Sequence, residues 1–220
     1  MKRDTLRQCY HVLFGWAEMA ATVNETTITL KGSADIVAEF FNYGINSILY
    51  QRGIYPPETF TQNQKYGLTI LMTDDKDLKE FLSNILKQVH DWLLSKELYR
   101  VSIVITDNNT LETLERWEFK IESDDALTKD GKPKQKDIKE IQKEIRDIIR
   151  QITASITFLP LLDNPCSFDI HLYTHKNTKV PDKWADTVPG EIANSQRVRL
   201  RSFSTTVHKV DACVFYRGCE

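Results

Sequence analysis

The chain has 220 residues, of which 41% are hydrophobic and 27% are charged, and its formal net charge is −2. These values are ordinary for a soluble globular protein, and no apolar run approaches the roughly 20 residues that a helix needs to cross a bilayer. The nearly balanced charge argues against a protein that coats nucleic acid with its whole surface.

The first 25 residues carry no clear structural pattern and are interpreted as an N-terminal extension. Gly15 and Glu18 interrupt their apolar run, and no small-residue cleavage site follows, which argues against a secretory signal. The four cysteines show no paired spacing: Cys9, Cys166, Cys213 and Cys219. We therefore expect free thiols in a reducing compartment, and so an intracellular protein.

A short strand and a long helix are predicted next. Apolar residues alternate with threonines over Thr26–Leu30, as in a strand. Ser33 is a typical helix N-cap residue, and the apolar residues after it recur at helical spacing until Gly53, a typical helix C-terminus. Gly44 lies inside this helix, where glycine costs about 1 kcal/mol relative to alanine, so we expect a close helix crossing there.

The following segment predicts a short strand, a second helix and a strand pair. Apolar residues alternate over 68–72, and Asp74 and Asp75 favour the start of a helix that continues to about Leu94. Alternation returns over 101–105 and 117–121, with a DNNT turn between the two runs. Because one face of each run is polar, they indicate a half-exposed antiparallel sheet.

Residues 136–157 have the most regular helical pattern, and the charged stretch before them, 123–135, predicts a solvated loop. Six isoleucines recur there at three- and four-residue spacing: Ile138, Ile141, Ile145, Ile148, Ile149 and Ile152. Isoleucine is a poor helix former, so burial must explain the pattern, at roughly 1.5–3 kcal/mol per buried side chain. We predict the central helix of the domain, with Arg150 and Gln151 exposed on it.

The last third of the chain predicts another strand and a hairpin. Residues 166–174 alternate as a strand, and Trp184 is the only large apolar anchor in the segment of prolines and polar residues that follows. Residues 198–216 resemble a hairpin that needs another surface to complete its core. Three helices covering one face of an antiparallel sheet give an α+β fold.

No catalytic or metal-binding pattern is specific. Cys166, His171 and His175 suggest a metal site only weakly, because residues on a strand and its exit do not converge at that spacing. A Cys166 or Cys213 nucleophile beside His208 lacks any feature that would activate the thiol. A thiol or metal enzyme is therefore a weaker alternative.

One cluster of basic residues allows a nucleic-acid alternative: Arg197, Arg199, Arg201, His208 and Lys209. Binding of a single strand would need aromatic platforms among them, and only Phe203 is present. A strand edge whose charges discourage aggregation is the better interpretation. An edge strand at 167–174 has another use, since its unpaired backbone groups can accept an extended partner segment. The residues alone thus favour a peptide-binding module.

Five segments closely resemble the HORMA-domain family: GSADIVAEFFNYGINSILYQRGIYPPETF (Gly32–Phe60), RQITASITFLPLL (Arg150–Leu162), CSFDIHLYT (Cys166–Thr174), VPDKW (Val180–Trp184) and VRLRSFSTTVHKV (Val198–Val210). The similarity runs in one register from about Thr26 to Tyr216. It favours the spindle-checkpoint branch over the translesion-polymerase and meiotic-axis branches. The resemblance implies a HORMA domain over 26–220, with three helices on an antiparallel sheet and a mobile C-terminal hairpin, or safety belt, over 177–220.

The resemblance also implies a function. It indicates a non-enzymatic adaptor without a cofactor, which switches between open and closed topologies and delays anaphase until kinetochores attach. The implied partners are the checkpoint coiled-coil receptor (mitotic arrest deficient one), the anaphase-promoting-complex activator (cell division cycle twenty), the kinase-like subunit of the mitotic checkpoint complex, a comet-type inhibitor with a remodelling ATPase, and a second copy in an open–closed homodimer. It implies neither nucleic acid nor membrane insertion. The expected location is the nucleus, the kinetochore and spindle in mitosis, and also the cytoplasm.

Two sets of site residues follow from the resemblance. A partner peptide would pair with the edge strand beneath the belt, which assigns peptide binding to Phe168, Ile170, Leu172, Tyr173 and Trp184. The face for the homodimer and the inhibitor matches Arg150, Gln151 and Phe158. The N-terminal strand near 26–30 would be displaced when the belt closes.

Overall fold

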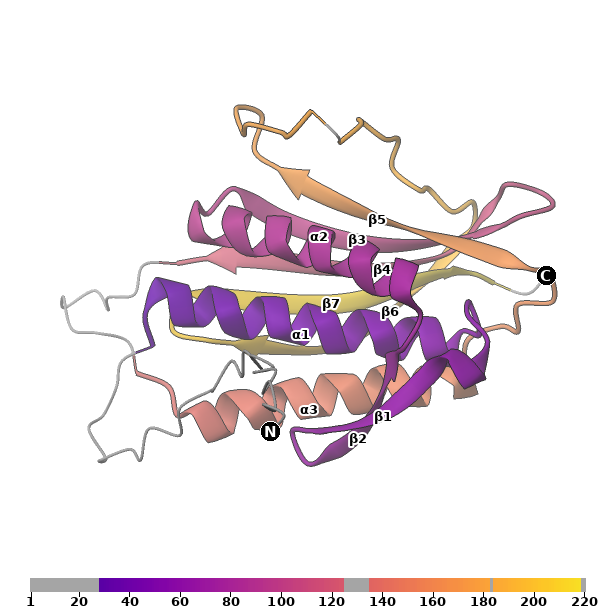
Figure 1. Ribbon diagram of the computed structural model, residues 1–220. Coiled ribbons are helices and arrows are strands. Elements are labelled where there is room, and N and C mark those ends of the chain that lie inside the picture. The colour runs from indigo at the N-terminus through magenta and orange to yellow at the C-terminus, as the bar shows by residue number, and fades with distance from the viewer. Residues whose placement is uncertain (1–27, 125–134, 183, 219–220) are drawn as a thin grey trace, which may run out of the picture.

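A computed structural model describes residues 28–124, 135–182 and 184–218. Three helices cover one face of a five-stranded antiparallel sheet (Figure 1), which confirms the predicted α+β architecture. Within these ranges, no helix combines the length and the apolar character that crossing a membrane requires.

The large sheet has the strand order β5-β3-β4-β7-β6. The strands are β3 (Leu98–Asp107), β4 (Thr113–Ser123), β5 (Cys166–Thr174), β6 (Ser195–Ser204) and β7 (His208–Arg217). All neighbours are antiparallel. The predicted strands at 101–105, 117–121 and 166–174 are thus confirmed, and the predicted hairpin is β6–β7.

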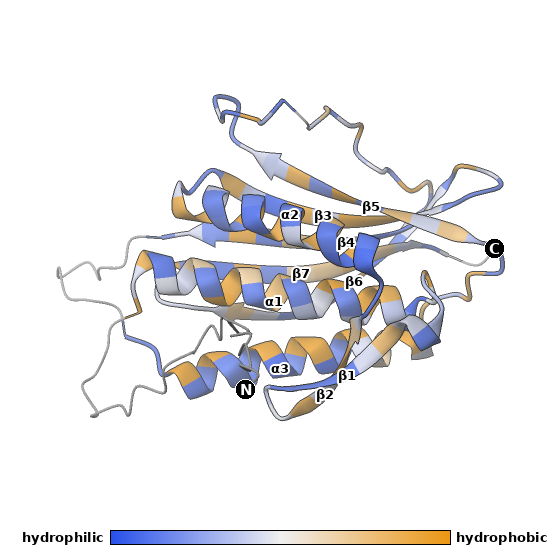
Figure 2. Cartoon of the chain, viewed as in Figure 1, coloured by the Kyte–Doolittle hydropathy of each residue, from blue (hydrophilic) through white to orange (hydrophobic). Residues whose placement is uncertain are grey.

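The central helix is α1 (Leu30–Gln51), which contacts both α2 (Lys76–Leu94) and α3 (Ile138–Ala154). The prediction that residues 136–157 form the central helix was therefore wrong. The isoleucines of α3 cover only one side, and Ile138 is 43% exposed. Figure 2 shows hydrophobic and polar residues alternating along the turns of α3, as one-sided burial requires. Gly44 faces Ile152 of α3 across the predicted helix crossing.

The start of α1 differs from the prediction. Thr29 is the N-cap and accepts a hydrogen bond from the Gly32 N–H, whereas Ser33 is buried inside the first turn. Leu30 belongs to the helix and not to a strand, and Thr26 and Thr27 lie outside the described residues. The Ser33 hydroxyl instead contacts Thr205 and His208 of the C-terminal hairpin. The predicted end at Gly53 is confirmed, with φ at +63°.

A second, small sheet was only half predicted. β2 (Leu68–Thr73) confirms the predicted strand, and it pairs with β1 (Phe60–Lys65), whose sequence FTQNQK has no apolar alternation. Short 3₁₀ turns precede β1 (Pro57–Thr59) and follow α3 (Ser155–Thr157). Asp75 caps α2 as predicted, and most of the predicted loop, 125–134, lies outside the described residues.

Candidate functional site

The two edges of the large sheet differ in how their backbone is covered. Beside β6, α3 supplies acceptors to the strand: Gln151 accepts from the Arg201 N–H at 2.7 Å, and Glu144 accepts from the Ser204 N–H at 3.0 Å. β5 pairs on one side with β3, and within the described residues no strand pairs with its other side. The outer edge of β5 is therefore the place where an extended segment can add to this sheet.

Aromatic side chains line the helix side of this free edge. The Phe168 ring lies 6.1 Å from that of Tyr55 and 5.9 Å from that of Phe81, which is 42% exposed. Ile170 and Leu172 are half-buried against the core on the same side. Because side chains alternate along a strand, every second residue of an added segment would face this apolar surface. Tyr173 lies on the other face, where the Arg100 guanidinium stacks on its ring at 4.5 Å.

The segment that connects β5 to β6 (residues 175–194) passes around the free edge. The Trp184 ring lies 5.7 Å from the Trp92 ring of α2, on the helix side of the sheet. Gly190 lies against Val104 and Arg116, on the opposite face. A chain with contacts on both faces beyond β5 has to turn around that strand, and Figure 1 shows this course outside β5. The free edge is thus enclosed by the connecting segment.

The C-terminal hairpin closes the enclosure by pairing with β4. Val210, Ala212 and Val214 of β7 are buried in the core, so β4 and the helices are the additional surface that the predicted hairpin needed. Its turn is tied to α1, since the Ser33 hydroxyl lies 2.5 Å from the Thr205 hydroxyl and 2.6 Å from Nδ1 of His208. These buried polar contacts join residues that are 172 and 175 positions apart in the sequence.

Acidification is expected to weaken this attachment. Burial lowers the pKa of His208, the backbone of Leu93 opposes this shift, and the charge of Lys96 adds to it. The folded protein therefore favours the neutral ring, and its stability should fall as the pH drops from about 6.5 towards the lowered pKa of the folded state. A His208→Gln variant should lose this part of the pH dependence, which thermal unfolding between pH 7.5 and 5 measures. An identical pH profile in both proteins would contradict the role of His208.

The residues considered for thiol or metal chemistry do not form a site. Burial raises the pKa of the Cys166 and Cys213 thiols, which disfavours the reactive thiolate. His208 contacts Ser33 instead of a cysteine, and the His175 ring packs on Tyr99. In the described part of the chain, no three His, Cys, Asp or Glu side chains are grouped closely enough to hold a metal ion. Cys166 and Cys213 are free thiols, and Cys9 and Cys219 lie outside the described residues.

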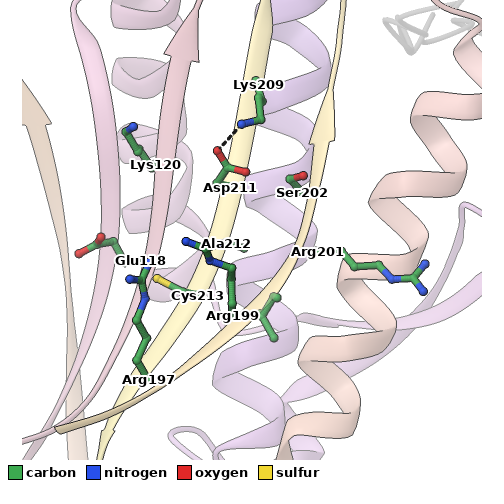
Figure 3. Close-up of a pocket in the computed structure, with 11 residues that line it drawn as sticks. Glu118, Lys120, Arg197, Arg199, Arg201, Ser202, Lys209, Asp211, Ala212 and Cys213 are labelled. Atoms are coloured by element: carbon green, nitrogen blue, oxygen red, sulfur yellow. Dashed lines mark hydrogen bonds and ion pairs between the residues drawn. The ribbon is translucent and has the colours of Figure 1, made fainter.

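The predicted basic cluster does not form one surface. Arg197 and Arg199 lie over the sheet face opposite the helices, whereas Arg201 points towards α3 (Figure 3) and donates to Asp147 at 2.6 Å. A register shift between Arg199 and Ser202 interrupts the alternation and explains this divergence. His208 is buried, and Lys209 pairs with Asp211. The groove beside these residues also contains Glu118, so its charge is mixed.

The residues of the implied regulator face lie at the C-terminal end of α3 and just beyond it. Arg150 is exposed, and Phe158 is 42% exposed after the 3₁₀ turn. Gln151 is partly engaged by the backbone of β6, as described above. Ile156 is also exposed in this region, and the sequence pattern did not single it out.

Comparison with known proteins agrees with this architecture. The HORMA domain family matches residues 33–208. The mitotic spindle assembly checkpoint protein MAD2A of Dictyostelium discoideum is 55% identical over 199 residues, which cover 90% of this chain and 97% of the relative. Human MAD2A is 55% identical over 193 residues, which cover 88% of this chain and 94% of the human protein. In a crystal structure of the mitotic checkpoint complex, one chain matches with a TM-score of 0.78 at 43% identity, covering 85% of this chain and 99% of that one.

Proposed function

The chain belongs to the HORMA domain family and, within it, to the MAD2 spindle checkpoint proteins, and we propose that it is a checkpoint adaptor that captures partner peptides on β5. The observation that carries this proposal is the course of residues 175–194 around the outer edge of β5, with which no strand pairs in the described part of the chain. A captured peptide would add to β5 as a strand beneath the connecting segment. Main-chain hydrogen bonds would supply affinity, and the surface around Phe168 and Phe81 would select apolar side chains.

Enclosure determines how such a complex forms and dissociates. With the hairpin paired to β4, the connecting segment surrounds the guest, so a guest with bulky flanks enters only after β7 separates from β4. That step breaks a long strand ladder and exposes buried side chains, and it is therefore slow. Affinity should then be expressed mainly in a slow dissociation rate. A partner can shift the balance between the open and closed arrangements only if the free energies of the two arrangements differ by no more than a few kcal/mol.

The proposed guests are peptides of the checkpoint coiled-coil receptor and of the anaphase-promoting-complex activator, and the proposed outcome is delayed anaphase. The kinase-like subunit of the mitotic checkpoint complex, a comet-type inhibitor and a remodelling ATPase complete the proposed partners. The proposed location is the nucleus and, in mitosis, the kinetochore and spindle. Membership in the MAD2 proteins supports these assignments, as does the match to a chain of the mitotic checkpoint complex. Catalysis has no part in this proposal.

Peptide capture tests the proposed function directly. A labelled peptide with a basic residue, an aliphatic pair and a downstream proline should bind the full chain and dissociate slowly, as measured by fluorescence anisotropy. Phe168→Asp should lower the affinity at least about tenfold, because a charge would replace an aromatic contact next to the guest. Asp163→Ala, an exposed change before β5, is the matched control. Full affinity in the Phe168→Asp variant would exclude β5 as the binding strand.

A second surface is proposed for self-association and regulation, through Arg150, Gln151 and Phe158. Arg150→Ala should weaken dimerisation measurably, because it removes an exposed charge without disturbing the core, and should leave peptide affinity unchanged. Sedimentation velocity measures the first effect and anisotropy the second. Lys143→Ala, an exposed change elsewhere on α3, is the control. Equal dimerisation of the wild-type and Arg150→Ala proteins would remove Arg150 from this role.

A further inference from the structure

Gly190 approaches the sheet more closely than any other residue type allows. A Cβ atom built on it would lie 2.7 Å from Cγ1 and 3.2 Å from Cγ2 of Val104, and 3.4 Å from the Thr113 hydroxyl. Its φ is not in the left-handed region, unlike those of Gly53 and Gly67. Space, and not backbone conformation, is therefore the reason for glycine at this position.

Arg116 binds the same residue through a hydrogen bond. Its Nη1 donates a hydrogen bond of 2.8 Å to the Gly190 carbonyl. The Arg116 guanidinium also lies 4.6 Å from the ring of Phe215, its direct partner across the β4–β7 ladder, and its Nε lies 3.7 Å from a Glu118 oxygen. A guanidinium fixed in this way donates a strong hydrogen bond without losing further side-chain entropy.

The Phe215 contact links the two parts of the C-terminal region. Phe215 reaches Arg116 only while β7 is paired with β4. The docked hairpin therefore orients the arginine that binds the connecting segment.

We propose that Gly190, Val104, Arg116 and Phe215 form a fastening that holds the connecting segment on the sheet and sets the lifetime of a captured peptide. The proposal rests on the function proposed above and adds the positioning residues that control release. Trp184 anchors the segment near α2, and the fastening anchors it on the opposite face. If the fastening is lost, the ring of chain around the guest loosens while the hairpin stays paired, so a short peptide with free ends can slip out lengthwise.

A steric rescue experiment tests the fastening. Gly190→Ala should speed dissociation of the labelled short peptide by about tenfold, as overpacking of a close contact predicts. Val104→Ala in the same chain removes the two methyl groups in the way, and the double variant should dissociate within about twofold of Val104→Ala alone. Val188→Ala, an exposed change two residues away, should leave the rate unchanged. The association rate of a guest fused between two folded domains should change little, since its entry still requires separation of β7 from β4.

A second measurement is independent of the peptide. Trypsin cleavage after the exposed residues Lys176 and Lys179 should be faster in Gly190→Ala and Arg116→Lys than in the wild-type protein without any guest, with unchanged thermal unfolding. Wild-type rates of both proteolysis and release in Gly190→Ala would overturn the fastening, and so would a failure of Val104→Ala to rescue. A wild-type protein that captures no peptide would instead refute the proposed function, while the proteolysis comparison would still decide on the fastening.

Discussion

Glu115→Ala is expected to lower the free energy of unfolding by about 3–5 kcal/mol, because it leaves the Arg52 guanidinium buried without a counter-charge. The side chains of Arg52 and Glu115 are only 3% and 2% exposed. Arg52 Nε donates to Glu115 at 3.0 Å, and the Trp117 indole donates to the same oxygen at 3.3 Å. Burial raises the pKa of Glu115, and the adjacent Arg52 opposes that rise.

The pair is important because of the segments that it joins. Arg52 is the C-cap of α1, and Glu115 is near the start of β4. Arg52 also donates a hydrogen bond of 2.5 Å to the Pro160 carbonyl, in the loop that leads to β5. Removing the carboxylate should therefore loosen the approach to the binding strand as well as the core.

Urea denaturation with two controls measures the effect. In the Arg52→Met/Glu115→Leu double variant, both charges are absent, and most of the lost stability should return. Glu112→Ala breaks the exposed pair with Arg217 and should cost at most about 1 kcal/mol. A loss below about 1 kcal/mol in Glu115→Ala would mean that water reaches Arg52 in the folded state.

Local patterns predicted the individual elements well. The spacing of apolar residues identified most of α1 and all of α2 and α3, and the alternation in 166–174 identified β5, because one-sided burial leaves its period in the sequence. The same argument misjudged which helix is central. A helix that is buried on several sides, as α1 is, has a weaker amphipathic pattern than a helix like α3 on the outside of the layer.

The errors at single residues have long-range causes. Ser33 has the chemistry of a cap, but its hydroxyl binds Thr205 and His208, which are far away in sequence. The register shift after Arg199 separated side chains that simple alternation had grouped. The local sequence does not mark Gly190 as a contact residue, because its contact with Val104 depends on the path of the connecting segment across the sheet.

A disulfide between Glu118→Cys and the natural Cys213 is expected to stop peptide exchange. The two residues are direct partners in the β4–β7 ladder, and Figure 3 shows them on these neighbouring strands. Opposed residues on antiparallel strands lie within the range of Cα separations that a disulfide spans. The bond would fix the hairpin on β4, and the connecting segment would then close a permanent ring around the edge of β5. A guest peptide fused between two folded domains could neither enter nor leave this ring.

Redox control makes this prediction specific. The oxidised Glu118→Cys variant should not bind the doubly fused guest, which is the peptide fused between two folded domains. Reduction of the disulfide should restore binding in the same sample. Protein loaded before oxidation should retain the guest against excess competitor. Because burial raises the pKa of Cys213, oxidation needs mildly alkaline conditions, and Cys166→Ser removes a competing thiol. Glu118→Cys with Cys213→Ser controls for the lost contacts of Glu118 with Arg100 and Arg116. If the oxidised protein still bound the doubly fused guest as fast as the reduced protein does, separation of β7 from β4 could not be the step that admits a partner.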